Sequence, residues 1–207
     1  MKEYTVEIEG VRLHLCAADT LFSPDGLDEG TRQMLRAVEW FPGAAVLDLG
    51  CGNGVVGIYA ALRVGEAGVC LGDVDTAAVA CARQNAEANG VGGVCIRQSD
   101  GLDAFPGQRF DIILSNPPYH ADFSVPKKFI RQSFAALRVG GRLYMVTKRR
   151  DWYENRLRAT FGGVRVTEAG GYFVFVAEKR ADRPPKKQKP APQLSKKLAR
   201  KYAKAGK

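Results

Sequence analysis

The feature that most restricts the fold of this 207-residue chain is a regular alternation between short apolar runs and longer segments with helical periodicity. Because the runs are apolar on both faces, each is expected to form a strand that is covered on both sides. Strands of this kind, separated by helices, form a parallel sheet. The runs are AAVLDLG, GVCLGDV, GVCIRQSD, FDIILSN and GRLYMVT, and the helical segments are residues 55–63, 76–89, 124–137 and 152–161.

Both ends of the chain depart from this alternation. Residues 4–17 form two alternating segments around a Glu-Gly pair, which predicts a β-hairpin before a helix at residues 27–41. Near the other end, GVRVTEAGGYFVFVAEK contains two strands with no room for a crossover helix, so the final strand must be antiparallel. The predicted fold is α/β and Rossmann-like: a mostly parallel seven-stranded sheet with an antiparallel last strand, plus an N-terminal β-hairpin.

Charge is distributed unevenly along the chain. Residues 1–126 hold 8 Lys and Arg against 17 Asp and Glu, residues 127–179 hold 12 against 4, and residues 180–207 hold 11 against 1. A basic half beside an acidic half indicates contact with a polyanion such as nucleic acid. The last 28 residues have too few large apolar side chains to build a core. We therefore predict a folded domain over residues 1–180 and a basic flexible tail over residues 181–207.

Composition excludes several classes of protein. A hydrophobic fraction of 45% with 26% charged residues is typical of a globular chain. No apolar run approaches the ~20 residues that span a bilayer, and the first residues lack the apolar stretch of a signal peptide. Five scattered cysteines without a C-x-x-C pair favour buried thiols in a reducing compartment. We expect a cytoplasmic protein without a membrane or metal partner. The oligomeric state stays open, with a monomer favoured over an oligomer.

A glycine-rich loop follows the first strand of the predicted sheet, in the order Asp48-Leu-Gly50-Cys-Gly52-Asn53-Gly54. Alternate glycines permit a sharp turn and a close approach to a ligand, and the following helix offers free N–H groups. From Gly52 onward the loop also matches the G-x-G-x-x-G fingerprint of dinucleotide-binding proteins. A carboxylate at Asp48 would repel a pyrophosphate, however, and it suits a ligand that carries an ammonium group.

Acidic residues follow the next two predicted strands as well. Asp73, with Val74 beside it, ends an apolar run about 20 residues beyond the glycine loop, where a carboxylate can bind both hydroxyls of a ribose. Asp75 is expected to be the N-cap of the next helix. Asp100 and Gly101 follow the third strand, where a turn or capping role is the alternative to a ligand contact.

The fourth predicted strand ends in Asn116-Pro117-Pro118-Tyr119, at the sheet edge where ligands bind in open α/β proteins. Two successive prolines lack N–H groups and hold a rigid turn, so the Pro117 carbonyl is fixed beside the Asn116 amide. Two such acceptors suit an amino group conjugated to a ring, because holding both hydrogens out of plane frees the nitrogen lone pair. Tyr119 offers a flat surface for a planar substrate. A simple proline turn is the alternative.

The glycine loop followed by N-P-P-Y about 60 residues downstream resembles class I S-adenosylmethionine-dependent amino-methyltransferases. The segments LFSPDGLDEGTRQML and GGRLYMVTKRR are further similar to small-subunit ribosomal RNA guanine-N2 methyltransferases, and this similarity covers residues 20–178. The resemblance implies that S-adenosylmethionine is the cofactor. It also implies methyl transfer to an exocyclic amino group of an RNA base, foremost guanine N2, with ribosomal RNA or a ribosomal particle as the partner.

The resemblance implies roles for individual residues. Asp100 would bind the adenine amino group, and the segment near Asp28–Thr31 would fold over the cofactor, with Thr31 as its contact. The alternative for Thr31 is a residue in the first turn of a helix that Asp28 caps. Residues 148–150, Lys-Arg-Arg, are interpreted as phosphate contacts, with a solvated loop as the alternative. The expected catalytic residues are Asn116, Pro117, Pro118 and Tyr119, and the expected cofactor-binding residues are Thr31, Asp48, Gly50, Gly52, Asn53, Gly54, Asp73, Val74, Asp100, Gly101 and Asn116.

Other functions stay open at this point. A protein-glutamine N5 methyltransferase or an adenine N6 methyltransferase acts on a similar amino group, although a peptide substrate needs no basic surface. An RNA-binding protein of the same fold without turnover would not need Asp48, Asn116, Pro117 and Tyr119. A dehydrogenase would leave the N-P-P-Y segment unexplained.

Overall fold

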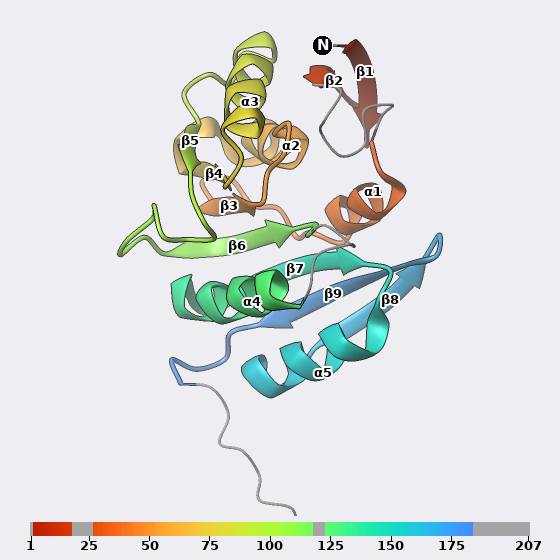
Figure 1. The fold of residues 1–207 in the computed structure, drawn as a ribbon, viewed down its shortest axis with the longest axis vertical. Coiled ribbons are helices and arrows are strands. Elements are labelled where there is room, and N and C mark those ends of the chain that lie inside the picture. The colour runs from red at the N-terminus through yellow and green to blue at the C-terminus, as the bar shows by residue number, and fades with distance from the viewer. Residues whose placement is uncertain (1, 18–26, 118–122, 184–207) are drawn as a thin grey trace, which may run out of the picture.

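The computed structural model describes residues 2–17, 27–117 and 123–183 (Figure 1). Pro118, Tyr119 and most of the predicted tail therefore lie outside the described residues. The domain boundary near residue 180 stays a prediction. The elements are β1 (Lys2–Ile8), β2 (Val11–Ala17), α1 (Glu29–Arg36), β3 (Val46–Leu49), α2 (Val55–Val64), a 3₁₀ turn (Glu66–Gly68), β4 (Val69–Asp73), α3 (Thr76–Ala88), β5 (Cys95–Gln98), β6 (Phe110–Ser115), α4 (Ser124–Ala136), β7 (Leu137–Thr147), α5 (Arg150–Phe161), β8 (Arg165–Ala169) and β9 (Tyr172–Glu178).

The large sheet has seven strands in the order β5-β4-β3-β6-β7-β9-β8. Strands β3 to β7 are mutually parallel, whereas β9 runs antiparallel to both of its neighbours, β7 and β8. This confirms the mostly parallel sheet with an antiparallel last strand. The chain proceeds from β3 outward to β5 and then returns to β6, so the strand order reverses between β3 and β6. Ligands of open α/β sheets bind beyond the carboxyl ends of the strands at such a reversal.

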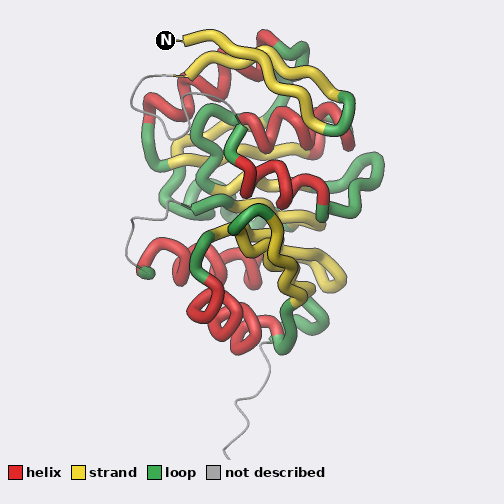
Figure 2. Tube along the Cα trace, turned by 90° about the vertical axis from the view of Figure 1, so that its right-hand side faces the viewer, coloured by secondary structure: helices red, strands yellow, loops and turns green. Residues whose placement is uncertain are grey.

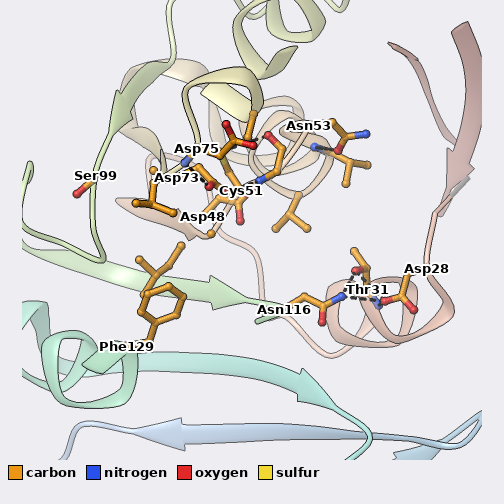
Figure 3. A pocket seen from close by; sticks show the side chains of 18 of the residues that line it. Asp28, Thr31, Asp48, Cys51, Asn53, Asp73, Asp75, Ser99, Asn116 and Phe129 are labelled. Atoms are coloured by element: carbon orange, nitrogen blue, oxygen red, sulfur yellow. Dashed lines mark hydrogen bonds between the residues drawn. The ribbon is translucent and has the colours of Figure 1, made fainter. Parts of the chain in front are cut away.

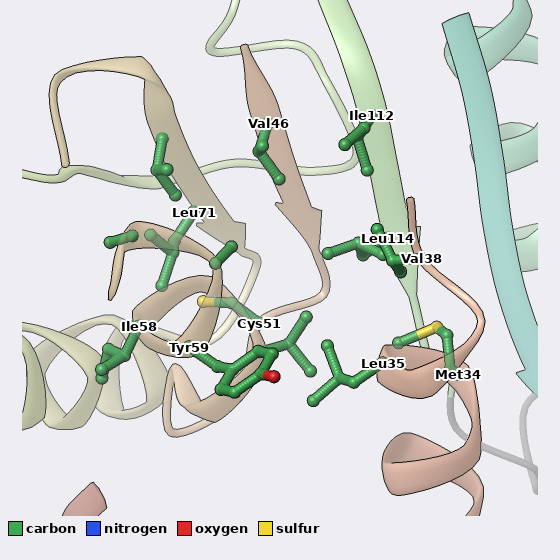
Figure 4. Packing of buried hydrophobic residues seen from close by; sticks show 14 of the residues in the cluster. Met34, Leu35, Val38, Val46, Cys51, Ile58, Tyr59, Leu71, Ile112 and Leu114 are labelled. Carbon is green, nitrogen blue, oxygen red and sulfur yellow. The ribbon is translucent and has the colours of Figure 1, made fainter. Parts of the chain in front are cut away.

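Helices cover both faces of the sheet and enclose two separate cores (Figures 1 and 2). Successive strand residues point to opposite faces, so Val46 belongs to one core and Leu47 to the other. Helices α1, α2 and α3 cover the first face, where Leu35 and Tyr59 pack among the strand residues (Figure 4). Helices α4 and α5 cover the second face. The helices thus cover the two faces of the sheet, and the carboxyl ends of β3, β4 and β6 remain available for a ligand-binding site.

The predicted N-terminal hairpin is confirmed, and it packs outside the main sheet. Strands β1 and β2 pair in an antiparallel register from Lys2 opposite Ala17 to Ile8 opposite Val11. The hairpin is attached to α3, because the buried Asn85 side chain accepts a hydrogen bond from the Cys16 amide at 2.7 Å. In the described part of the chain, no helix combines the length and apolar character needed to cross a membrane.

Helix α1 is shorter than predicted, whereas the other four helices lie within two residues of their expected bounds. The expected helix ran over residues 27–41, but α1 ends at Arg36. Ala37 and Val38 donate to carbonyls three residues earlier, which tightens the final turn before the chain leads to β3. Trp40 still packs against the first core from outside the helix. The spacing of Trp40 therefore indicated contact with the core, where it is partly buried, and not helical structure.

Candidate functional site

A cavity of about 350 Å³ opens at the carboxyl ends of β3, β4 and β6 (Figure 3). This volume lies within the range of roughly 300–1,000 Å³ that is typical of small-molecule sites. Most of the residues expected to bind the cofactor line it. They are Thr31, Asp48, Gly50, Gly52, Asn53, Asp73, Val74, Asp100, Gly101 and Asn116. Gly54 is the one expected cofactor residue that does not.

The glycine loop between β3 and α2 forms one wall of the cavity. A Cβ added at Gly52, where φ is +53°, would meet no atom within 4 Å, so this glycine leaves the backbone open to a ligand. At Gly54, where φ is +87°, an added Cβ would lie 2.9 Å from the Cβ of Ala82. Gly54 therefore allows close packing of the loop on α3. Contact of Gly54 with a cofactor stays a prediction.

Asp48 is buried at the base of the cavity, with 2% of its surface exposed. One carboxylate oxygen accepts a hydrogen bond from the Gly57 amide at 2.8 Å, near the start of α2. Burial raises the pKa of Asp48 to about 7, against the lowering effect of this hydrogen bond, and the nearby Asp73 charge raises it further. The charged form of Asp48 would therefore gain stability from a cation in the cavity.

Asp73 supports the glycine loop as well as lining the cavity. Its Oδ2 accepts a hydrogen bond from the Gly52 amide at 2.9 Å, and its Oδ1 accepts one from the Asp75 amide at 3.0 Å. Asp75 in turn caps α3 by accepting from the Ala77 amide, which confirms the predicted N-cap. One carboxylate at the end of β4 therefore fixes the loop after β3 and the start of α3 together.

Asp100 lies at the rim of the cavity, not in its interior. Its side chain is 70% exposed and forms an ion pair with Lys128 of α4 at 2.8 Å, a residue that also pairs with Asp103 at 2.8 Å. These pairs connect α4 to the segment after β5. If Asp100 binds an adenine amino group, its carboxylate must interact with that group and with Lys128 at the same time.

Asn116 lies at the end of β6, across the cavity from the glycine loop (Figure 3). Its amide nitrogen donates to Asp28 Oδ2 and to Thr31 Oγ1, both at 2.8 Å. Asp28 also accepts from the Thr31 amide, which confirms it as the N-cap of α1. These contacts point the nitrogen of the Asn116 amide toward α1 and its carbonyl oxygen away from α1. Pro117, which follows, is buried.

Asp28 and Tyr4 line the cavity, and neither was among the predicted catalytic or cofactor-binding residues. Asp28 was expected as a helix cap within the segment that folds over the cofactor, and its contact with Asn116 joins positions 88 apart in the sequence. Tyr4 of β1 accepts a hydrogen bond at its hydroxyl from the Asn53 amide at 2.5 Å, and burial raises its pKa. No local sequence signal marks either contact, because both depend on how α1 and the hairpin pack against the domain.

The three basic residues after β7 are exposed, and each contacts a neighbour within the protein. The Lys148 ammonium lies 4.8 Å from the centre of the Tyr172 ring, and the Arg149 guanidinium lies 5.3 Å from that of Phe123. Arg150 pairs with Glu154 at 3.1 Å. Contact with phosphate therefore remains a prediction for these residues. Among the residues that the structure describes, no group of three or more His, Cys, Asp or Glu side chains could hold a metal ion.

The chain is similar to several methyltransferases of ribosomal RNA. It is 34% identical over 181 residues to the ribosomal RNA small subunit methyltransferase C of Pseudomonas entomophila, which covers 85% of this chain and 54% of that protein. It is 38% identical over 161 residues to the ribosomal RNA large subunit methyltransferase G of Streptomyces avermitilis, covering 75% of this chain and 42% of that protein. The chain thus spans about half the length of the curated relatives that it matches.

A solved structure with a similar fold is a 16S rRNA N2 guanine methyltransferase of T. thermophilus in complex with AdoMet and guanosine. The two chains share 29% identity and superpose with a TM-score of 0.77, over 86% of this chain and 50% of the other. The sequence profile of the methyltransferase small domain family matches residues 12–176, a span that contains the glycine loop, Asp73 and Asn116. The family resemblance inferred from the motifs is thereby confirmed, and this chain belongs to the methyltransferase small domain family.

Proposed function

We propose that this protein transfers a methyl group from S-adenosylmethionine to an exocyclic amino group of an RNA base, with guanine N2 in ribosomal RNA as the target. The observation that carries the proposal is the orientation of the Asn116 amide, whose nitrogen is held by Asp28 and Thr31. This orientation turns the carbonyl oxygen away from α1, and Asn116 lines the same cavity as the glycine loop.

The lining of the cavity suits the chemical groups of S-adenosylmethionine, which supplies an electrophilic methyl group on a sulfonium. The buried Asp48 carboxylate would pair with the ammonium group, and Thr31 lies on the segment that would cover the amino-acid end. Asp73 would accept hydrogen bonds from the ribose hydroxyls. Val74 is apolar yet 65% exposed at the cavity, so an adenine ring would cover it. Asp100 and Gly101 would contact the edge of that ring.

Asn116 would act on the amino group that receives the methyl. An amino group conjugated to a base is a poor nucleophile, because its lone pair is delocalised into the ring. Hydrogen bonds to the Asn116 carbonyl oxygen and to the backbone carbonyl of Pro117 would favour the pyramidal nitrogen and free the lone pair for attack. Preorganised acceptors of this kind lower the barrier because they need no reorganisation during the reaction.

The identity of the substrate is supported by the relatives and by charge. The matched proteins include methyltransferases named for the small and for the large ribosomal subunit, which supports ribosomal RNA as the substrate class. The similar T. thermophilus structure contains guanosine, which supports guanine as the base. The excess of basic residues after position 126 favours RNA over a peptide. A ribosomal substrate would also place the protein in the cytoplasm.

The proposal is tested by incubating the full chain with methyl-tritiated S-adenosylmethionine and four acceptors: ribosomal RNA, assembled ribosomal subunits, DNA and ribosomal proteins. We expect label in one of the two ribosomal samples, and N2-methylguanosine after digestion of the RNA to nucleosides. Asn116→Ala serves as the inactive control that still binds the cofactor. Label only in protein would contradict the RNA assignment, and N6-methyladenosine in the digest would contradict the choice of base.

A further inference from the structure

We infer that Asp28 is a positioning residue that fixes which way the Asn116 amide faces, and that Tyr172 of β9 holds Asp28 in place. This inference rests on the proposed function, because it gives Asn116 a role in methyl transfer. Asp28 Oδ2 accepts hydrogen bonds from the Thr31 amide at 3.0 Å, the Thr31 hydroxyl at 3.2 Å and the Asn116 amide at 2.8 Å. Capping α1 requires only the first of these contacts.

The chemistry of the two partners allows only one orientation of the Asn116 amide. An ionised carboxylate accepts hydrogen bonds and donates none. The Thr31 hydroxyl has a single hydrogen, which it donates to Asp28, so toward Asn116 it can only accept at 2.8 Å. Both groups on this side of the amide are therefore acceptors, and they exclude the flipped amide that would bring its oxygen toward them. The carbonyl oxygen of Asn116 consequently stays on the side away from α1.

Tyr172, the first residue of β9, lies next to Asp28 in the fold. Its side chain hydrogen-bonds Asp28, which together with burial and the charges of Asp28 and Glu29 raises the pKa of Tyr172 to about 12. Toward a carboxylate a tyrosine hydroxyl can only act as the donor, and the two side chains lie together beside Gly30, where an added Cβ would lie 3.1 Å from Asp28 Oδ2. Gly30 permits the close approach of the ring, because an added Cβ would lie 2.4 Å from the Tyr172 Cδ1 atom. The Lys148 ammonium lies 4.8 Å from the centre of the same ring.

Three variants separate positioning from helix capping. Asp28→Ser keeps a good N-cap but is too short to reach Asn116, so kcat should fall about tenfold or more, equivalent to ~1.4 kcal/mol. The melting temperature and the affinity for S-adenosylhomocysteine should change little. Asp28→Asn places an amide oxygen where Oδ2 lies and should restore kcat to within about threefold of the wild type. Tyr172→Phe should lower kcat by about threefold, because Asp28 keeps its contacts and loses one restraint.

Glu29→Gln is the matched control, because it removes the adjacent carboxylate, whose own contacts are with Gln33 and Arg32. It should leave kcat unchanged. A second readout needs no turnover: the ¹⁵N–¹H signals of the Asn116 side-chain amide. Asp28→Ser should shift these signals and speed their exchange with water, whereas Glu29→Gln should not.

These measurements distinguish the two claims. Unchanged amide signals and an unchanged kcat in Asp28→Ser would overturn the positioning role, even if the wild type methylates RNA as proposed. Equal losses of kcat in Asp28→Ser and Asp28→Asn would also overturn it, because the rescue would have failed. A wild type that methylates no RNA would defeat the proposed function, and the amide signals would then still decide whether Asp28 orients Asn116.

Discussion

The two loops that face each other across the cavity are held in place in different ways. The loop after β3 takes its shape from nearby sequence, with glycines at alternate positions and Asp73 only 21 residues from the amide that it binds. The segment after β6 depends on Asp28 and Thr31, which lie 88 and 85 residues away from Asn116. The conformation of the loop after β3 is determined by residues close to it in the sequence. The orientation of the Asn116 side chain is determined by contacts that form only when the domain is assembled. We therefore expect changes in the two loops to affect cofactor binding and catalysis separately.

The sharpest test of this separation is Asn116→Ala. We expect the rate of methyl transfer to fall by roughly 10²-fold or more, comparable to the loss of one preorganised contact worth ~3 kcal/mol. Affinity for S-adenosylhomocysteine, measured by calorimetry, should remain nearly unchanged. If rate and affinity fall by the same factor, Asn116 supports the cavity as a whole and the two loops are not separate.

Asp48→Ala tests the opposite loop. Removing a charge-assisted contact costs roughly 1.5–3 kcal/mol, so cofactor affinity should fall by about 10- to 150-fold. The rate at saturating cofactor should change much less, because Asp48 is not proposed to contact the amino group of the base that receives the methyl. The measurement is calorimetric titration with S-adenosylhomocysteine, with NAD as a control ligand. Tight binding of NAD without binding of S-adenosylhomocysteine would show that the cavity belongs to a different cofactor.

The pH dependence should also originate in the loop after β3. Because the pKa of Asp48 is about 7 in the folded protein and ~3.9 in an unfolded chain, the folded state holds the extra proton between these values. The stabilisation is complete below pH ~4 and is lost as the pH rises through 7, at up to ~1.4 kcal/mol per pH unit. Denaturant unfolding from pH 4 to 8 should show this decline in the wild type and a flatter profile in Asp48→Asn. Identical profiles would mean that Asp48 titrates at its ordinary pKa.

A smaller effect should separate the cost of positive φ from the cost of a close side-chain contact at Gly54 of the glycine loop, with Gly43, which precedes β3, as the control position. Gly54→Ala and Gly43→Ala both place a side chain at positive φ, which costs roughly 1–3 kcal/mol. Only at position 54 would the new Cβ approach another side chain closely, at 2.9 Å from Ala82, whereas at position 43 it would meet nothing within 4 Å. Gly54→Ala should therefore be the less stable variant in thermal unfolding, by about 1–3 kcal/mol of overpacking. Equal stabilities would show that α3 shifts to accommodate the methyl group.

Truncation after Arg180 is expected to have the smallest effect on cofactor binding. Removing residues 181–207, which hold ten basic residues and one acidic residue, should leave cofactor affinity unchanged. The melting temperature should fall slightly, because the buried Lys179 loses its ion pair with Asp182 at 3.4 Å. RNA affinity should fall, and if about five cations contact phosphates, the slope of log K against log salt should become shallower by ~3.5. The measurement is RNA affinity of both chains over a salt series. Parallel lines would show that the tail makes no phosphate contacts.

Patterns within 20 or so residues predicted most of the fold and one side of the site. The alternation of apolar runs and helical segments predicted the parallel sheet, and glycine spacing with Asp48 and Asp73 predicted one wall of the cavity. The length of α1 could not be predicted, because Trp40 packs against the first core, partly buried, without lying on a helix. The contact between Asp28 and Asn116 could not be predicted either, since it depends on how α1 packs against β7 and β9.

The position of β9 between β7 and β8 sets an order of events during synthesis. Strand β8 pairs with β9 and with no other described strand, so it cannot join the sheet until β9 has emerged from the ribosome. Until then the edge of β7 is unpaired, a state that favours association with other chains. Tyr172 is the first residue of β9 and reaches the N-cap of α1. A nascent chain can therefore form the glycine loop early, but it acquires the complete set of contacts around Asn116 only after β9 has been inserted.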